Sequence, residues 1–97
     1  MIFSDSHAHL NFPDFSEDLE QVLRKASSRK VGYVNTISTK LSEVRSLLEL
    51  CATHPNVFTT VGIHPHNAND AEDYSVETLV ALADHAKVVA IGETGFD

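Results

Sequence analysis

The 97-residue chain has no tryptophan, a single cysteine (Cys51) and few aromatic side chains, 7% of the total. One cysteine cannot form a disulfide within the chain, which fits a reducing compartment. The scarcity of aromatic residues means that the core must be mainly aliphatic, and the 42% of hydrophobic residues is enough to build one. The composition therefore predicts one small folded domain rather than a disordered segment.

Basic residues are also scarce. Lys and Arg together number 7 against 14 Asp and Glu, for a formal net charge of −7. Modules that hold nucleic acid through cationic side chains need the opposite balance, because neutralisation of phosphate dominates their affinity. The charge argues against such a module. It remains compatible with an enzyme that meets phosphate through bound cations.

Long apolar runs are missing as well. No stretch approaches about 18 uninterrupted apolar residues, the length that spans a membrane. The first 12 residues combine neither a basic segment nor a long apolar one, so they do not resemble a secretory signal. We therefore expect a cytoplasmic protein with no membrane partner.

Short strand-like runs alternate with helical patterns along the chain. Buried strands are predicted over residues 1–7, 31–37, 57–63 and 88–92. Between them, apolar residues recur at helical spacing in three stripes: Leu19, Val22, Leu23 and Ala26; Leu41, Val44, Leu47, Leu48 and Cys51; and Val76, Leu79, Val80 and Ala83. The order β-α-β-α-β-α-β predicts an α/β fold with parallel strands and right-handed crossovers.

Several residues mark the ends and the inner faces of these helices. Asp14, with Glu17 three residues later, is typical of a capping box before the first helix, and Ser75 is a candidate N-cap of the third. Cys51 lies in the apolar stripe of the helix over 41–53, so we interpret it as a core residue rather than a nucleophile.

Four of the basic residues cluster near the C-terminus of the first predicted helix: Arg24, Lys25, Arg29 and Lys30. Their position favours solvated charges that interact well with the helix macrodipole. A phosphate-binding patch is the alternative interpretation.

Reactive side chains follow three of the predicted strands. They are His7 and His9 after the first strand, His64 and His66 after the third, and Glu93 and Asp97 after the fourth. The C-terminal ends of parallel strands share one rim, and active sites of α/β proteins form there. The sequence therefore predicts a functional site at this rim.

His7 and His9 are the best candidates for metal ligands. Side chains two residues apart in a strand point to one face, so both imidazoles can converge on one ion. Asp5 has the same parity and is placed to support the site from one layer deeper. A lone His-x-His is a weak signal. Glu93 strengthens it, because a buried carboxylate at the same rim needs a partner and a bound cation would supply one.

The alternative for Glu93 is an exposed carboxylate in a turn flanked by Gly92 and Gly95. His64 and His66 form a second rim motif around Pro65, whose ring stiffens the turn. Both are candidates for binding an anionic oxygen of a substrate. For His66, a turn histidine without a role is an almost equal alternative, whereas the position of His64 nearer the strand end favours function.

Three blocks of the sequence resemble one known family. Residues 4–11 (SDSHAHLN), 61–66 (VGIHPH) and 91–97 (IGETGFD) are similar to successive signature blocks of the TatD-type metal-dependent deoxyribonucleases. Three motifs in the right order are far more specific than any one of them. The resemblance spans the chain and identifies residues 1–97 as the N-terminal part of a single (β/α)8 hydrolase domain, here an incomplete TIM-type barrel.

The resemblance also implies a reaction and a set of roles. Family members hydrolyse phosphodiester bonds, typically in DNA and with 3′→5′ exonuclease character, and need one or two divalent cations such as Mg²⁺, Mn²⁺ or Zn²⁺. In that pattern His7 and His9 bind one ion. Glu93 is the catalytic carboxylate shared between two ions, and His64 lies near the substrate phosphate.

The length departs from the family pattern. A complete barrel takes about 250 residues, and two later histidines and a late aspartate of the family site have no counterpart here. The apolar edges at residues 1–7 and 88–92 predict self-association. Two alternatives stay open. One is another amidohydrolase-like enzyme acting on a C–N or ester bond, which the Gly-Glu-Thr-Gly block disfavours. The other is a truncated, catalytically inactive fragment that binds metal.

Overall fold

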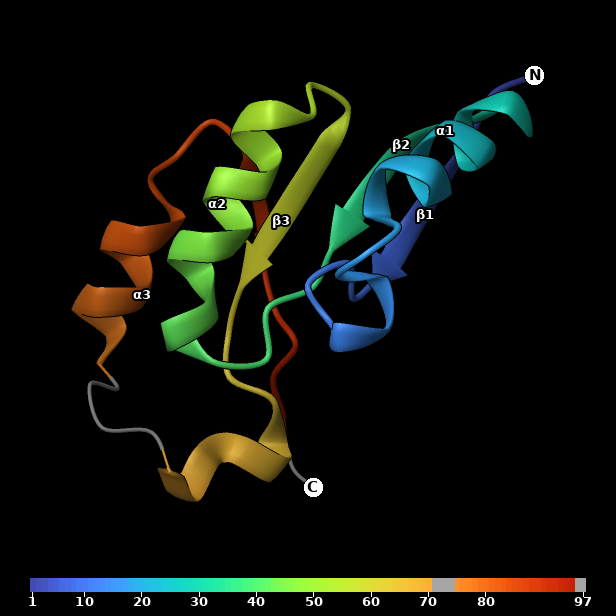
Figure 1. Ribbon diagram of the computed structural model, residues 1–97. Helices are drawn as coiled ribbons and strands as arrows, with labels where there is room; N and C mark the ends of the chain where they lie inside the picture. The colour runs from blue at the N-terminus through green and yellow to red at the C-terminus, as the bar shows by residue number, and fades with distance from the viewer. Residues whose placement is uncertain (71–74, 96–97) are drawn as a thin grey trace.

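The computed structural model describes residues 1–70 and 75–95. Strands and helices alternate along them (Figure 1): β1 (Phe3–Ala8), α1 (Leu19–Ser28), β2 (Val31–Thr36), α2 (Val44–Thr53), β3 (Val57–Val61), α3 (Val76–Ala83) and β4 (Val88–Ile91). Short 3-10 helices cover Pro13–Phe15, Leu41–Glu43 and Pro65–Asp70. The predicted β-α-β-α-β-α-β order is confirmed. No described helix has the length and apolar character needed to cross a membrane.

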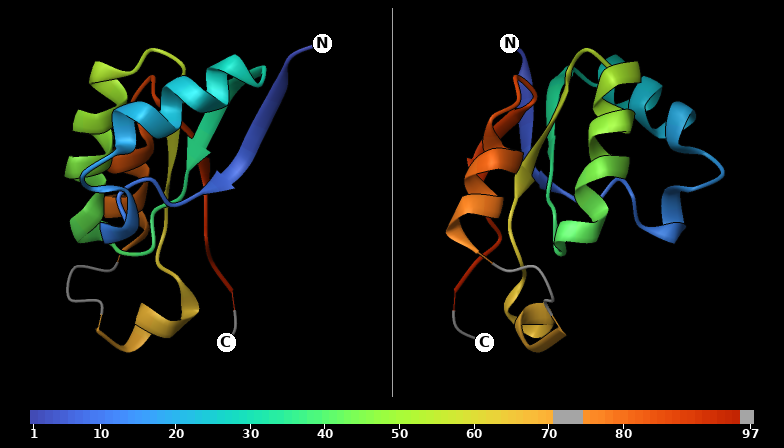
Figure 2. Two further views of the ribbon diagram at one scale, coloured as in Figure 1. Left: turned by 45° about the vertical axis from the view of Figure 1, so that its right-hand side comes forward. Right: turned by 90° about the vertical axis from the view of Figure 1, so that its left-hand side faces the viewer.

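The four strands form one parallel sheet in the order β1-β2-β3-β4. The helices pack against the strands that they connect, with α1 on β2, α2 on β3, and α3 on β3 and β4. Figure 2 shows that the sheet is curved and that its two outer strands do not meet along their length. The α/β class with parallel strands is therefore confirmed, in a sheet that does not close.

The core lies between the sheet and the helices. Alternation along β2 turns Val34 and Thr36 toward the helices, where both are buried. Leu47 lies on α2, which packs on β3, and is 0% exposed; burial of such a side chain stabilises the fold by about 1.5–3 kcal/mol. On the other face, Tyr33 is 55% exposed and its ring lies 6.4 Å from that of Phe58. One face of the sheet therefore carries the core, and Tyr33 on the other stays open to solvent.

The predicted N-cap at Asp14 is wrong. Asp14 lies inside the 3-10 helix Pro13–Phe15, whose N-cap is Phe12, and α1 begins only at Leu19. The cause is Pro13, because a proline favours the first position of a helical turn and starts one there. The prediction for Ser75 is confirmed, since its hydroxyl accepts a hydrogen bond from the Thr78 N–H at 3.0 Å.

Cys51 is a core residue, as predicted. It is 1% exposed, and burial raises the pKa of its thiol, an effect that the charge of Lys87 only partly offsets. At pH 8 the folded chain therefore holds less of the reactive thiolate than an ordinary cysteine would.

We expect Cys51 to react with a disulfide reagent such as DTNB at least about 100-fold more slowly in the native chain than in urea, because the core must first open. Stopped or manual mixing at pH 8 measures both rates. Equal rates would contradict the buried position.

Candidate metal centre

Side chains from the two outer strands meet at the C-terminal rim. One nitrogen each of His7 and His9 and one oxygen of Glu93 lie within 4.8 Å of one another. In a flat sheet, β1 and β4 would be three strand spacings apart, roughly 14 Å. Curvature of the sheet therefore brings residues that are about 85 positions apart in the sequence into one cluster. The sequence-predicted convergence of these three side chains is observed.

Hydrogen bonding fixes which nitrogen of His9 can bind an ion. Nδ1 lies 3.2 Å from the backbone carbonyl of Ile37, at the end of β2. A carbonyl oxygen only accepts, so Nδ1 carries the proton and donates it. Nε2 is then left with a free lone pair. This second contact is the kind that orients metal-binding histidines in proteins.

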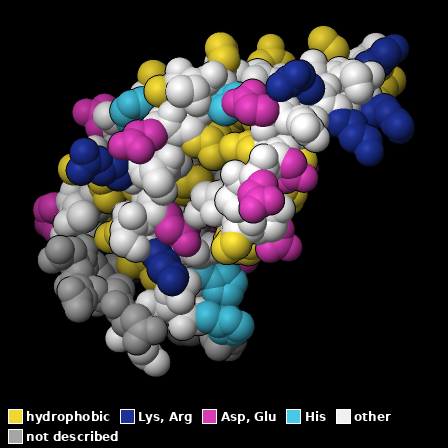
Figure 3. Space-filling model, in the orientation of Figure 1, with side chains coloured by type: hydrophobic (Ala, Val, Ile, Leu, Met, Phe, Trp, Pro, Cys, Tyr) yellow, Lys and Arg dark blue, Asp and Glu magenta, His cyan; other side chains and the backbone are white. Residues whose placement is uncertain are grey.

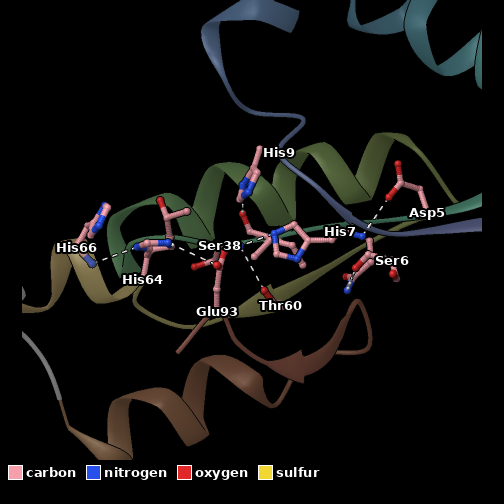
Figure 4. A network of polar contacts seen from close by, with 12 residues as sticks. Asp5, Ser6, His7, His9, Ser38, Thr60, His64, His66 and Glu93 are labelled. Carbon is pink, nitrogen blue, oxygen red and sulfur yellow. Dashed lines mark hydrogen bonds and ion pairs between the residues drawn. The ribbon is translucent and has the colours of Figure 1, made fainter. Parts of the chain in front are cut away.

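His7 faces the carboxylate of Glu93, with 3.4 Å between Nε2 and Oε2. The side chain of His7 is 53% exposed and that of Glu93 is 33% exposed, so this contact alone contributes little to stability. Asp5 does not join the cluster. Its Oδ1 accepts the backbone N–H of His7 at 3.1 Å, and Figure 4 shows its carboxylate beside the backbone of His7 and apart from the imidazoles. Asp5 thus supports the backbone of His7 and not its ring.

His64 completes the group from the end of β3. Its Nε2 lies 3.4 Å from the second carboxylate oxygen of Glu93, so Glu93 stands between the two histidines (Figure 4). The backbone N–H of His66 donates to Nδ1 of His64 at 3.1 Å. In neutral His64 the proton therefore sits on Nε2 and points toward Glu93. This tautomer makes His64 a hydrogen-bond donor rather than a metal ligand.

His66 lies beside His64 and outside the group of His7, His9 and Glu93. The ring centroids of the two histidines are 4.9 Å apart, and His66 is exposed at the start of the 3-10 helix. Both residues lie at the rim, and His64 contacts Glu93. Their role in binding an anionic oxygen of a substrate stays a prediction. Asp97, the last residue predicted at the rim, lies outside the described residues.

The segment after β2 links the strand ends at the rim by hydrogen bonds, and no motif of the sequence points to it. Ser38, fully buried, donates its hydroxyl to the carbonyl of Gly62 at 2.9 Å, and its N–H bonds to Oγ1 of Thr60 at 3.2 Å. The carbonyl of Thr39 accepts the N–H of His64 at 2.9 Å. The available signal was position: Ser38 and Thr39 directly follow the second strand and so belong to the same rim.

The donor set fits a divalent cation. Ligand atoms lie about 2.0–2.2 Å from Zn²⁺, which places neighbouring ligands roughly 3–4 Å apart, slightly closer than the spacing here. Small side-chain rotations would close that difference. Two imidazoles and one carboxylate suit Zn²⁺ and the transition metals, and three protein ligands leave positions for water or substrate, as in catalytic sites. The residues present therefore fit the ion that the sequence predicts.

The main cluster of basic side chains lies away from this rim. Figure 3 shows Lys and Arg side chains gathered at the end of the molecule where α1 ends, and a further basic group beside the histidines of the lower rim. The cluster Arg24, Lys25, Arg29 and Lys30 belongs to that end, so it is not a phosphate-binding patch of this site.

Comparison with known proteins places these features in a family. The profile of the family described as TatD related DNase matches residues 4–97. The metal-dependent hydrolase YcfH of Escherichia coli (strain K12), described as uncharacterized, is 39% identical over 100 residues, which cover 100% of this chain and 37% of YcfH. The 3′-5′ ssDNA/RNA exonuclease TatD of Salmonella typhimurium is 31% identical over 93 residues, covering 96% of this chain and 36% of that protein.

A solved structure gives the same result. The crystal structure of YjjV, a TatD homologue from Escherichia coli, superposes with a TM-score of 0.86 at 36% identity, over 98% of this chain and 38% of YjjV. The chain thus spans somewhat more than a third of the length of these relatives. Both the profile match and the superposition agree with the incomplete barrel seen in the open sheet. The chain belongs to the TatD-related family.

Proposed function

We propose that this chain carries the first metal-binding residues of a hydrolase that cleaves phosphodiester bonds in DNA with 3′→5′ exonuclease character. The convergence of His7, His9 and Glu93 at one rim is the observation that carries the proposal. Membership of the TatD-related family supports it, and one relative is named a 3′-5′ ssDNA/RNA exonuclease.

The roles of the residues follow from their contacts. His7, His9 and Glu93 would hold a divalent cation, Mg²⁺, Mn²⁺ or Zn²⁺, and Glu93 would be the catalytic carboxylate. A bound cation supplies Lewis-acid polarisation of a phosphoryl oxygen. His64 presents Nε2–H beside Glu93 and would donate it to a phosphate oxygen of the substrate. The backbone N–H of His66 donates a hydrogen bond to Nδ1 of His64 and so orients its ring. The ring of His66 lies beside that of His64, where it would contact the same substrate.

The charge of the chain agrees with these roles. A net charge of −7 repels a polyanion unless positive charge is supplied at the reacting centre. The cluster of basic side chains near the end of α1 lies at the far end, and a bound cation would supply positive charge at the centre itself. We therefore expect both the binding and the cleavage of DNA to require the cation.

A cleavage assay tests the proposal. A 5′-labelled single-stranded oligodeoxynucleotide is incubated with the chain and Mg²⁺, Mn²⁺ or Zn²⁺, and with EDTA as the metal-free control. We expect cation-dependent shortening from the 3′ end that Glu93→Ala reduces at least about 100-fold. Cleavage that persists in EDTA and in Glu93→Ala would contradict the mechanism. Hydrolysis of an ester such as p-nitrophenyl acetate, with DNA left intact, would instead indicate the C–N or ester class.

We also propose that two copies of the chain associate through the edges of the sheet. β1 and β4 are the outer strands, and exposed apolar side chains lie on both: Phe3 is 54% exposed, Val89 55% and Ile91 53%. All neighbouring strands are parallel, so β4 of one copy can pair with β1 of a second in the direction that the sheet already uses. Repeating this contact about a two-fold axis would give an eight-stranded closed sheet, which a barrel of this type has.

Light scattering coupled to size-exclusion chromatography tests this association. We expect a dimer at tens of micromolar, and we expect Val89→Lys to shift it toward monomer, because a charged edge residue opposes strand pairing. Glu49→Lys on the exposed face of α2 is the matched control and should leave the dimer intact. A monomer at all concentrations would contradict the proposal.

A further inference from the structure

Phe12 is an exposed aromatic residue beside the candidate metal centre. Its ring lies nearly parallel to that of His9, with centroids 4.5 Å apart and planes 14° apart. The residue nevertheless stays 39% exposed. An aromatic ring that is stacked on a metal-ligand candidate and is still open to solvent offers a surface to a second planar group.

The backbone holds this ring in position. The N–H of Phe12 donates to the carbonyl of His9 at 3.2 Å, and the carbonyl of Phe12 accepts from the N–H of Phe15 at 3.0 Å. Pro13 follows directly and restricts the conformation of Phe12 further. A side chain on such a fixed turn loses little conformational entropy when a ligand covers it.

Other large hydrophobic side chains that are exposed lie on other elements. Within residues 1–70 and 75–95 they belong to the N-terminus, the strands or α3: Met1, Ile2, Phe3, Tyr33, Val76, Val80, Val89 and Ile91. The exposure of Phe3, Val89 and Ile91 follows from their position on the outer strands of a sheet that does not close. Phe12 sits on the loop after β1, at the rim itself, and has no such explanation.

Resting on the nuclease function proposed above, we propose that Phe12 contacts the substrate by stacking on a nucleobase next to the scissile phosphodiester, and so selects single-stranded nucleic acid. A base stacks on an aromatic ring whatever its identity, because every base has a π face. In a duplex the bases are already stacked on one another and cannot reach Phe12. Stacking also gives an acidic chain a means of holding DNA that does not depend on basic residues.

The competing role for Phe12 is purely structural: its bulk would orient His9 and nothing more. Leucine separates the two roles, since Phe12→Leu keeps apolar bulk beside His9 but removes the π face. Phe12→Tyr keeps the ring and serves as the conservative variant. Titration of each variant with Zn²⁺ alone shows whether the metal centre is still intact.

The binding probe is a short single-stranded oligodeoxynucleotide with phosphorothioate linkages, which resist cleavage, and with 2-aminopurine at its 3′ end. Its fluorescence is followed during titration with each protein in Mg²⁺. A twin oligonucleotide has an abasic site in place of 2-aminopurine, and its binding is measured by anisotropy. We expect quenching with wild type and Phe12→Tyr, and about 10-fold or more weaker binding with Phe12→Leu. With the abasic twin, wild type and Phe12→Leu should bind equally.

Two results would overturn the inference. If Phe12→Leu quenches and binds as wild type does, the ring only supports His9. If Phe12→Leu weakens binding of both oligonucleotides by the same factor, the effect does not pass through the base. Failure of the wild-type chain to bind either oligonucleotide, while it still binds Zn²⁺, would overturn the nuclease function itself and is distinguishable from both.

Discussion

Replacing Glu93 with glutamine is expected to remove most of the stabilisation that a divalent cation gives this chain. A cation at 100 times its dissociation constant stabilises the native state by about 2.7 kcal/mol. For a domain of this size, 1 kcal/mol shifts the melting temperature by roughly 4–8 °C, so Zn²⁺ should raise that of wild type by roughly 10–20 °C. Glu93→Gln keeps the shape but loses the charge of the one carboxylate in the cluster. The shift should fall to a few degrees at the same concentration.

The metal-free stability of the Glu93 variant should change little, because the side chain is 33% exposed and its contacts with His7 and His64 are long, at 3.4 Å. Differential scanning fluorimetry with and without Zn²⁺ measures both quantities. Glu49→Gln is the matched control, since Glu49 is a 72% exposed carboxylate on α2. An undiminished Zn²⁺ shift in Glu93→Gln would show that the ion binds elsewhere.

Gly62→Ala is expected to destabilise the fold and to displace Glu93. A Cβ at Gly62 would lie 2.5 Å from the backbone carbon of Gly92, 2.6 Å from its oxygen and 3.0 Å from the nitrogen of Glu93. Backbone atoms cannot rotate away as a side chain can, so the end of β4 must move. Overpacking of this kind costs about 1–3 kcal/mol, and the movement carries Glu93 away from the histidines.

Gly92→Ala is the control for this substitution. A Cβ at Gly92 meets nothing within 4 Å, although the residue lies on the other side of the same contact. We expect urea unfolding to show a loss of free energy for Gly62→Ala that Gly92→Ala does not share. Zn²⁺ affinity should fall in the first variant and be kept in the second. Equal effects of the two substitutions would contradict the close approach of β3 and β4.

Much of the fold was predictable because its periodicities are strong. The β-branched and aromatic residues at 57–61 and the helical stripe ending at Cys51 specify a buried strand and a core-facing helix without reference to the rest of the chain. The start of α1 was not predictable from capping residues alone. Pro13 starts a separate turn, and α1 then begins at Leu19 without a side-chain cap.

The sequence indicated which three side chains would cluster, but not the geometry of the cluster. His7, His9 and Glu93 are marked by their position after strands of a parallel sheet, and that rule needs no coordinates. Their closeness depends on the curvature of the sheet, which no local pattern encodes. The tautomers of His9 and His64 depend on the carbonyl of Ile37 and the N–H of His66, contacts of the backbone that side-chain motifs do not reveal.

Nitrogen NMR of the histidine rings tests most directly whether His7 and His9 bind a divalent cation at the rim. The chain is labelled with ¹⁵N-histidine and titrated with Zn²⁺, with each ring assigned by substitution. We expect the resonance of His9 Nε2 to move to a metal-bound chemical shift while Nδ1 stays protonated, and a nitrogen resonance of His7 to move with the same midpoint. His54, held by Glu20, and His85, at the end of α3, should not move. Shifts at His54 or His85 with none at His7 and His9 would contradict binding of the cation at the rim.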